Sequence, residues 1–455
     1  MKKIICLILA ALMLFAALTG CSKKVEDATP ATDAEAPAQT SQDSTETAEG
    51  ETKKYNVTLH VVGVDNVVST TFMQYADELE ELYGITIDFQ QFSNEQSSNK
   101  IAVSMAAGGS DIDVMMIRPL DGTLLYSQNG WLENLQPYID ADPSVEYDDF
   151  MTACADVCTD ADGDTVCLPV MTESGVIFYN KTLFEKAGIT KTPETWEELY
   201  ETAVKLNDPA NDICGFACRG SGNPAVTQFS AVIRSFGGDF FDENKNATIN
   251  TPEAIEAFQF YGKLLRDAGP AGVLNMGWIE TWNLFTQGKC AMRLDANTNL
   301  GSWNDDDSVI SLDEVGFFDV PTGPNGDYGN YYITSWALAI SSGSPNKEAA
   351  WQFVKWASSK EMQIRAQQNG NSGARLSCWA EDYLPWPQEA QEIAAIAGNK
   401  SYGTDRPYCI NVSEARDLIG EVIVAAIEGT DDASLQKLAD EKNAQFQALL
   451  DSEKQ

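Results

Sequence analysis

From residue 55 onwards, short apolar runs alternate with segments that repeat apolar residues at three- and four-residue spacing. The runs Tyr55–Val64, Ile85–Phe89 and Val114–Ile117 are rich in β-branched residues and have the length of buried strands. Between them, the segments 70–83 and 96–107 have the helical period, and glycine follows each segment, as is typical of helix ends. This order predicts a mostly parallel sheet with helices on both faces, an α/β fold.

The alternation continues through the second half of the chain, and the last third is mainly helical. Thr195 and Glu198 form a capping-box pattern ahead of an apolar helical period, which predicts a helix start at Trp196. The remaining strands are expected at 175–179, 213–219, 290–294, 315–320 and 336–340, and the remaining helices at 122–128, 196–206, 227–236, 252–268, 345–357, 360–368, 414–428 and 433–450.

The N-terminus predicts export and a lipid anchor. Two lysines precede the apolar run Ile4–Leu18, which is shorter than a membrane span and typical of a signal peptide. Leu18-Thr19-Gly20-Cys21 resembles the bacterial lipobox, so we expect residues 1–20 to be removed and Cys21 to carry the lipid. Residues 21–54 contain no aromatic side chain before Tyr55, which predicts a disordered tether of roughly 30 Å. The body would then lie on the outer face of a cell membrane, most simply that of a Gram-positive cell.

Composition narrows the possible partners. The formal charge of −38 disfavours a nucleic-acid partner, because phosphates would be repelled. The only histidine is His60, in a predicted strand, so the usual general base and metal ligand are nearly missing from the chain. Hydrophobic residues make up 44%, enough for a large core.

Ten cysteines fit an exported protein. Cys6 would leave with the signal peptide and Cys21 would carry lipid, so eight remain in the body. In the segment between Cys158 and Cys167, a two-residue turn at Asp162-Gly163 would place these cysteines opposite each other on a hairpin, close enough for a disulfide. The connectivity of the other six stays open.

No cofactor or metal ion is expected. Residues 220–225 fit the glycine pattern of a dinucleotide site. We interpret them as a polar loop, because the protein is expected to be exported and because other strands come first in the chain. The acidic segments 160–164 and 242–246 have the spacing of calcium loops but lack the glycine at position six. We interpret the first as a hairpin turn and the second as a loop before a helix.

Five short motifs occur in one order along about 240 residues. They are Asp111–Ile117 with Gly130–Leu135, Asp162-Gly163 to Pro169, Phe178–Gly188 with Pro193–Leu199, Phe285–Met292, and Ser344–Val354. With them the chain resembles the extracellular solute-binding proteins of ABC importers, of the maltose-type class, and its segments 215–220 and 373–377 resemble the sugar and sugar-alcohol branch. Residues 118–119 and 170–172 depart from the usual pattern, which leaves the ligand open.

This resemblance implies a two-lobed periplasmic-binding-protein-like fold of type II, with the ligand cleft between the lobes. The expected first lobe comprises residues 55–170 and 322–366, and the second comprises 171–321 and 367–455. The chain would cross between lobes near 168–173, near 317–323 and near Gln368.

The resemblance also implies a function without catalysis. A lipid-anchored subunit would capture a sugar, sugar alcohol or oligosaccharide, close around it by a hinge motion, and deliver it to the ABC permease. The alternative is an extracellular glycoside hydrolase, because the chain has the carboxylates and tryptophans that such enzymes use. A lipoprotein that presents a ligand to a sensor, or that only adheres, would have the same fold.

The candidate ligand-binding residues are carboxylates, amides, guanidinium groups and tryptophans near predicted strand ends, where open sheets place ligands. Family position implies that Glu173 accepts hydrogen bonds from ligand hydroxyls and that the ring of Trp336 faces the cleft. For every candidate, a surface, capping or core role is the alternative. The others are Asp65, Arg118, Asp121, Gln228, Trp278, Asp295, Asn297 and Arg375.

Overall fold

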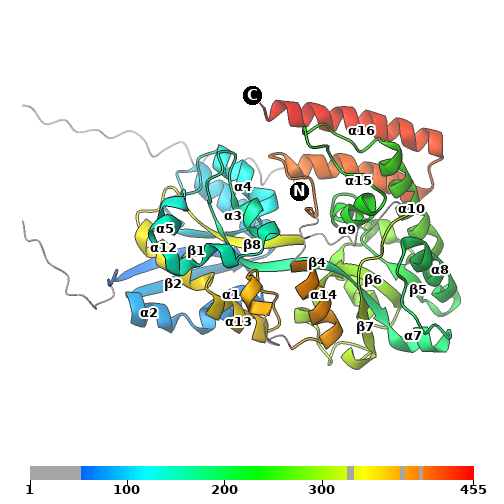
Figure 1. Cartoon of the computed structure of the whole chain (residues 1–455), viewed down its shortest axis with the longest axis horizontal. Helices are drawn as coiled ribbons and strands as arrows, with labels where there is room; N and C mark the ends of the chain where they lie inside the picture. The colour runs from blue at the N-terminus through cyan, green and yellow to red at the C-terminus, as the bar shows by residue number, and fades with distance from the viewer. Residues whose placement is uncertain (1–52, 325–332, 380–384, 399–402, 455) are drawn as a thin grey trace, which may run out of the picture. The chain divides into compact units, whose positions relative to one another are not determined.

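The computed structural model describes residues 53–324, 333–379, 385–398 and 403–454 (Figure 1). The expected signal peptide, Cys21 and nearly all of the expected tether lie outside the described residues. Within the described parts of the chain, no helix has the length and apolar character needed to cross a membrane.

The first half of the chain forms the predicted strands, and a late strand joins them. β1 (Val57–Val64) pairs in parallel with both β2 (Ile85–Phe92) and β3 (Val114–Ile117). β8 (Ile333–Ile340) then pairs antiparallel with β3, although it follows β3 by more than 200 residues in the sequence. The strand order is β2-β1-β3-β8-β4-β6-β5.

One strand, β4 (Leu168–Asn180), extends through both halves of the structure (Figure 1). Its first part pairs with β8, and from Gly175 onward it pairs with β6 (Cys290–Ala296) and β7 (Val315–Phe318). β6 in turn pairs in parallel with β5 (Cys214–Ala217). The sequence predicted a separate strand at 175–179, but the backbone is continuous with the expected crossing segment.

Helices cover the sheet, and their starts follow ordinary capping rules. The side chain of Thr195 accepts a hydrogen bond from the backbone N–H of Glu198, as the capping-box pattern predicted. The single helix expected at 70–83 is two helices, because the backbone leaves helical geometry at Tyr75 and an acidic first turn opens a second helix at Asp77. The α-helices are α1 (Val67–Gln74), α2 (Asp77–Tyr83), α3 (Asn94–Ala106), α4 (Pro119–Gln128), α5 (Gln136–Ala141), α6 (Thr152–Ala155), α7 (Lys181–Lys186), α8 (Trp196–Leu206), α9 (Gly222–Ser235), α10 (Pro252–Ala268), α11 (Trp278–Thr286), α12 (Lys347–Ala357), α13 (Lys360–Gln368), α14 (Gln388–Gly398), α15 (Val412–Glu428) and α16 (Asp432–Ser452).

Two large hydrophobic cores lie on either side of the middle of β4. The first packs β1, β3 and β8 against α1 and α12 around Phe72 and Phe353. The second packs α8, α9, α10 and α15 around Trp196, Phe229 and Phe258, and the last two rings stack at 4.3 Å between centroids. Each core is large enough to stabilise its own set of elements.

The expected boundaries of the lobes stay a prediction. The segment after α13 hydrogen-bonds with the first core, since the backbone N–H of Met151 donates to Ala374 and that of Thr172 donates to Ser372, both at 2.9 Å. These contacts hold residues 372–374 beside β4 and the segment that precedes α6.

The predicted Cys158–Cys167 disulfide is wrong, because both residues are free thiols in the structure. The hairpin pairs Thr159 with Thr165, so its turn has three residues instead of two. This shift by one residue places Cys158 opposite Val166 and leaves Cys167 diagonal to it. Burial raises the pKa of the Cys158 thiol, which keeps it protonated.

Candidate ligand-binding site

A small pocket of about 20 Å³ opens where β1 and β3 end and α3 and α4 begin. Arg118 is the N-cap residue of α4, and Pro119 follows it at the first helical position, so the turn after β3 directs Arg118 and Asp121 to the same edge of the sheet. The lining residues are Val64, Asn94, Ser97, Ser98, Ile101, Met116, Ile117, Arg118, Asp121, Gly122, Tyr126 and Trp336. Asp65 follows β1 beside this pocket and is exposed.

Arg118 lies between an aromatic ring and two carboxylates. Its guanidinium carbon is 4.7 Å from the ring centroid of Trp336, a cation–π contact. Nη1 is 4.0 Å from Asp121 and Nη2 is 4.0 Å from Glu173, so both separations exceed hydrogen-bond length. Nε is buried and has no hydrogen-bond partner among the described residues.

Trp336 is a pocket residue, but it does not open its strand as expected. β8 begins at Ile333, and Trp336 lies inside it, paired with Met171 of β4. Only 5% of the side chain is exposed, so one part of the ring packs in the first core while the guanidinium of Arg118 covers another. The ring is thus both a core residue and part of the pocket wall.

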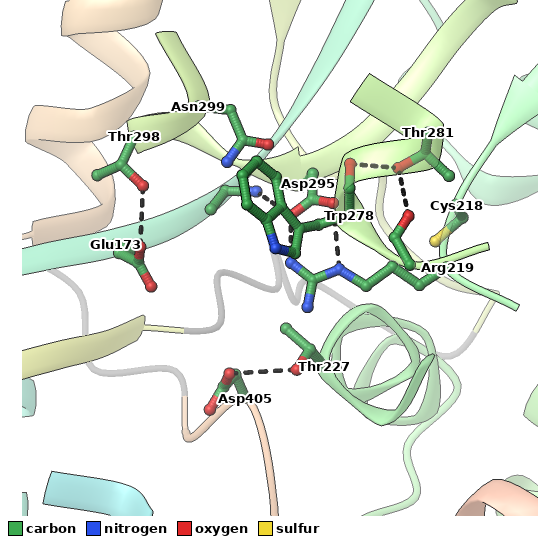
Figure 2. Close-up of polar contacts among 12 residues, drawn as sticks. Glu173, Cys218, Arg219, Thr227, Trp278, Thr281, Asp295, Thr298, Asn299 and Asp405 are labelled. Carbon is green, nitrogen blue, oxygen red and sulfur yellow. Dashed lines mark hydrogen bonds and ion pairs between the residues drawn. The ribbon is translucent and has the colours of Figure 1, made fainter. Parts of the chain in front are cut away.

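Glu173 lies on β4, at the level where this strand changes partners. Its Oε1 accepts a hydrogen bond from the hydroxyl of Thr298 at 3.0 Å, as Figure 2 shows. The neighbouring Asn297 accepts from the backbone N–H of Ser174 at 3.1 Å, while its Nδ2 is buried without a partner among the described residues. These contacts fix the loop after β6 against β4.

Asp295, at the end of β6, is fully buried and binds two arginines. Arg219 donates to both carboxylate oxygens at 3.2 and 2.6 Å, and Arg293 donates at 2.8 Å. Burial alone would raise the pKa of Asp295, but Arg219 and Arg293 hold it below its ordinary value. Trp278 is adjacent, since its carbonyl accepts from Arg293 at 3.3 Å, and 43% of it is exposed (Figure 2).

A second charged group, which sequence reasoning missed, joins α4 to α9 and α15. Arg406 donates to Asp121 and to the neighbouring Asp405, and Asp405 accepts from the hydroxyl of Thr227 at 3.3 Å (Figure 2). Arg416 also donates to Thr227, at 3.2 Å. Burial opposes the charge on Asp405, yet Arg406 and Arg416 hold its pKa well below the ordinary value.

Gln228 follows Thr227 in α9 and is fully buried, and neither its Oε1 nor its Nε2 has a hydrogen-bond partner among the described residues. A buried carboxamide without partners costs stability, so such groups often mark a place where a ligand supplies them. Gln228 therefore stays a candidate ligand-binding residue.

Arg375 does not belong to this group. Its guanidinium donates to the carbonyls of Val145, Glu146 and Ser358 and to the carboxylate of Asp149. Only 2% of Arg375 is exposed, because its hydrogen bonds join segments of the first core. The assignment of Arg375 to the cleft was wrong, since the strong donor capacity of an arginine serves structure as readily as ligand binding.

The acidic segments have local structural roles. The carboxylate of Asp160 accepts from the backbone N–H groups of Asp162 and Asp164, and Asp242 does the same with Asn244 and Asn246. Within the described residues, no group of three or more histidine, cysteine, aspartate or glutamate side chains has a metal-binding arrangement.

The site combines positively and negatively charged hydrogen-bonding side chains, an aromatic face and a pocket at strand ends. These are the features of a protein that binds a polar ligand. The family described as bacterial extracellular solute-binding protein matches residues 65–364, more than half of the chain. The chain therefore belongs to this family, and the resemblance inferred from its motifs is confirmed.

Individual relatives agree with this assignment. The mannitol-binding protein of Pseudomonas aeruginosa is 29% identical over 338 residues, which cover 72% of this chain and 76% of the relative. The fold resembles an ABC transporter solute-binding protein of Agrobacterium radiobacter K84 in complex with ribitol, with a TM-score of 0.76, 24% identity, and coverage of 86% and 98% of the two chains. It also resembles one of Agrobacterium vitis S4 with bound D-mannitol, with a TM-score of 0.71, 26% identity, and coverage of 87% and 98%.

These comparisons confirm the two-lobed fold of periplasmic binding proteins and the interpretation as a binding protein of the ABC transporter type. They are evidence against the glycoside hydrolase alternative, because the family and the relatives are binding proteins and not enzymes.

Proposed function

We propose that this protein is the lipid-anchored solute-binding subunit of an ABC importer, which captures a sugar alcohol or a related sugar and delivers it to the permease. The relatives support this ligand class, since their names or bound ligands include mannitol, ribitol, and erythritol or L-threitol. The ABC transporter class printed for these relatives supports a permease as the partner.

One observation carries the proposal: the Arg118 guanidinium lies on the Trp336 ring at the pocket, with the carboxylates of Asp121 and Glu173 on either side. A polyol has hydroxyl groups that both donate and accept, and C–H groups that pack on an aromatic face. Guanidinium donors, carboxylate acceptors and a tryptophan ring meet all three requirements.

The trapping mechanism requires ligand contacts from both cores. Arg118 and Asp121 directly follow β3, a strand of the first core, and Gln228 lies on α9, a helix of the second. A ligand that bonds to both sets only when they approach each other shifts the population toward the closed state. The closed form would then dock on the permease, and no bond of the ligand is broken.

Isothermal titration calorimetry of the full chain against alditols, monosaccharides and oligosaccharides tests the proposal directly. A saturable signal with an alditol or a related sugar is expected, and chromatography should recover the ligand unchanged. Binding of amino acids or peptides with no response to any carbohydrate would contradict the proposed ligand class.

Closure has its own test. Ligand at a hundredfold excess over Kd should raise the free energy of unfolding by about 2.7 kcal/mol. Small-angle scattering should show a smaller radius of gyration under the same conditions. Stabilisation without compaction would contradict the trap while leaving ligand binding intact.

Glu173→Gln tests the site. Its carboxylate has one oxygen held by Thr298 and the other directed toward Arg118. We expect binding to weaken by about 1.5–3 kcal/mol, the usual contribution of a hydrogen bond to a charged group. Unchanged affinity would remove Glu173 from the site.

The anchor rests on Cys21 and on the signal that precedes it. Cys21→Ala should release the exported protein from the membrane fraction into the medium, since the chain would lose its lipid. A variant that remains in the membrane fraction would contradict anchoring through Cys21.

A further inference from the structure

Arg118 differs from the other arginines of the chain. All nine arginines lie in the described residues, and Arg118 is the one whose guanidinium makes no hydrogen bond there, although only 21% of its side chain is exposed. Its nearest carboxylate oxygens are at 4.0 Å on both sides. The buried Nε in particular is costly to leave without an acceptor, unless another group supplies one.

The two carboxylates beside Arg118 have the same arrangement. Asp121 has one oxygen bound by Arg406 and the other 4.0 Å from Nη1 of Arg118. Glu173 has one oxygen bound by Thr298 and the other 4.0 Å from Nη2. Each carboxylate is therefore fixed by a neighbour while its second oxygen faces a guanidinium nitrogen without reaching it.

A separation of this size fits one bridging hydroxyl group. Two hydrogen bonds of about 2.8 Å that meet at one oxygen span about 4–5 Å between their outer atoms. A hydroxyl can accept from the guanidinium and donate to the carboxylate at once, whereas a carboxylate ligand can only accept. Because Nη1 and Nη2 form one rigid fork, the two bridged oxygens would be as close together as hydroxyls on adjacent carbons.

We propose that Arg118, Asp121 and Glu173 form a recognition unit for two adjacent hydroxyls of the ligand, and that its two carboxylates exclude acidic sugars. This inference rests on the proposed function and specifies its ligand as a neutral vicinal diol. A carboxylate oxygen of an acid in either bridging position would lie within hydrogen-bond distance of Asp121 or Glu173 with no proton between the two oxygens. Arg406 and Arg416 balance the charges of Asp121 and Asp405, so the exclusion rests on the missing proton at each bridge and not on net charge.

The first test compares each alditol with its own acid. Titration calorimetry at pH 7 would use the full chain with D-mannitol and D-mannonate, and with ribitol and D-ribonate. We expect the acid to bind at least tenfold more weakly than the alditol. An acid that binds equally or more tightly overturns the inference but leaves a solute-binding protein, whereas no binding of either member of each pair also removes the proposed sugar-alcohol ligand.

Two variants test the mechanism of this selectivity. Glu173→Gln replaces one carboxylate, which only accepts, with an amide that can also donate, so the affinity ratio of mannonate to mannitol should rise at least threefold even though mannitol binds less tightly. Glu78→Gln in α2, which pairs with Arg365 outside the pocket lining, is the control and should leave the ratio unchanged. A ratio that does not move in Glu173→Gln would overturn the exclusion of acids.

Arg118→Lys tests whether both guanidinium nitrogens, Nη1 and Nη2, are needed. A lysine keeps the positive charge, but all its donors are on one nitrogen. It therefore cannot donate to two adjacent hydroxyls in the geometry that Nη1 and Nη2 allow. Mannitol affinity should fall at least tenfold while the thermal midpoint of the unliganded protein changes little. Arg365→Lys is the matched control. Wild-type affinity in Arg118→Lys would show that the guanidinium does not bind two adjacent hydroxyls.

Discussion

Replacing Asp295 by asparagine should destabilise the protein strongly at neutral pH. The carboxylate is fully buried and accepts hydrogen bonds from Arg219, Arg293 and the backbone N–H of Ala296. Asparagine has nearly the same shape but no charge, so two guanidinium groups lose their shared counter-ion. Breaking a buried ion pair by removing one partner costs about 3–5 kcal/mol. Since a domain of 150–250 residues loses about 2–4 °C per kcal/mol, the lower value corresponds to a fall of about 6–12 °C in thermal midpoint.

Urea denaturation of the unliganded protein, followed by circular dichroism, measures this loss. Asp212→Asn is the matched control, because Asp212 pairs with Lys289 at 2.7 Å but its side chain is 86% exposed. An exposed pair contributes little, so the control should keep the wild-type midpoint. A loss below about 1 kcal/mol in Asp295→Asn would refute the reasoning, since it would equal the effect of an exposed pair.

The same comparison has a defined pH dependence. The pKa of Asp295 is lower in the folded protein than its ordinary value, so its contribution is fully present above the pKa of the unfolded chain, about 3.9. It is lost as the pH falls through the folded-state pKa. The stability gap between wild type and Asp295→Asn should therefore be constant from pH 5 to 7 and shrink below about pH 4. A gap that widens on acidification would contradict this sign.

Three further predictions follow from single contacts. Gly215→Ala should cost about 3 kcal/mol or more in urea denaturation, because the new Cβ would lie 1.8 Å from the backbone oxygen of Ala203; an unchanged midpoint would contradict this packing. Tryptophan emission should shift when ligand binds, and Trp336→Phe should abolish most of the shift; persistence of the full shift would assign it to another tryptophan. Alkylation of the denatured, unreduced protein should label both Cys158 and Cys167, and protection of the pair would show a disulfide.

The local elements and the family could be derived from the sequence. Strand and helix periods, together with caps such as Thr195, depend on neighbouring residues and therefore appear directly in the order of amino acids. The family motifs also lie within short segments, so they can be recognised without knowing which segments meet. The same short-range information did not determine whether the hairpin turn before Cys167 has two or three residues, and this single residue decides which side chains face each other.

The composition of the site was only partly accessible to sequence reasoning. Glu173, Arg118, Asp121 and Trp336 were named from strand ends and family position, and the structure brings them to one place. Arg406 was missed because it lies in a segment without periodicity and meets Asp121 across 285 positions. Pairing over such a distance is decided by how the elements pack.

Burial and partner choice were decided by the tertiary structure alone. Arg375 and Arg118 are the same residue type near the ends of elements. Every guanidinium nitrogen of Arg375 donates a hydrogen bond inside the first core, whereas among the described residues the guanidinium of Arg118 donates none. The sequence determined that strongly donating side chains stand at these positions. Only the packing of β4, β8 and the loop after β6 determined which donors face carbonyl groups and which face the pocket, because the free energy of a charged side chain depends on the neighbours that replace water around it.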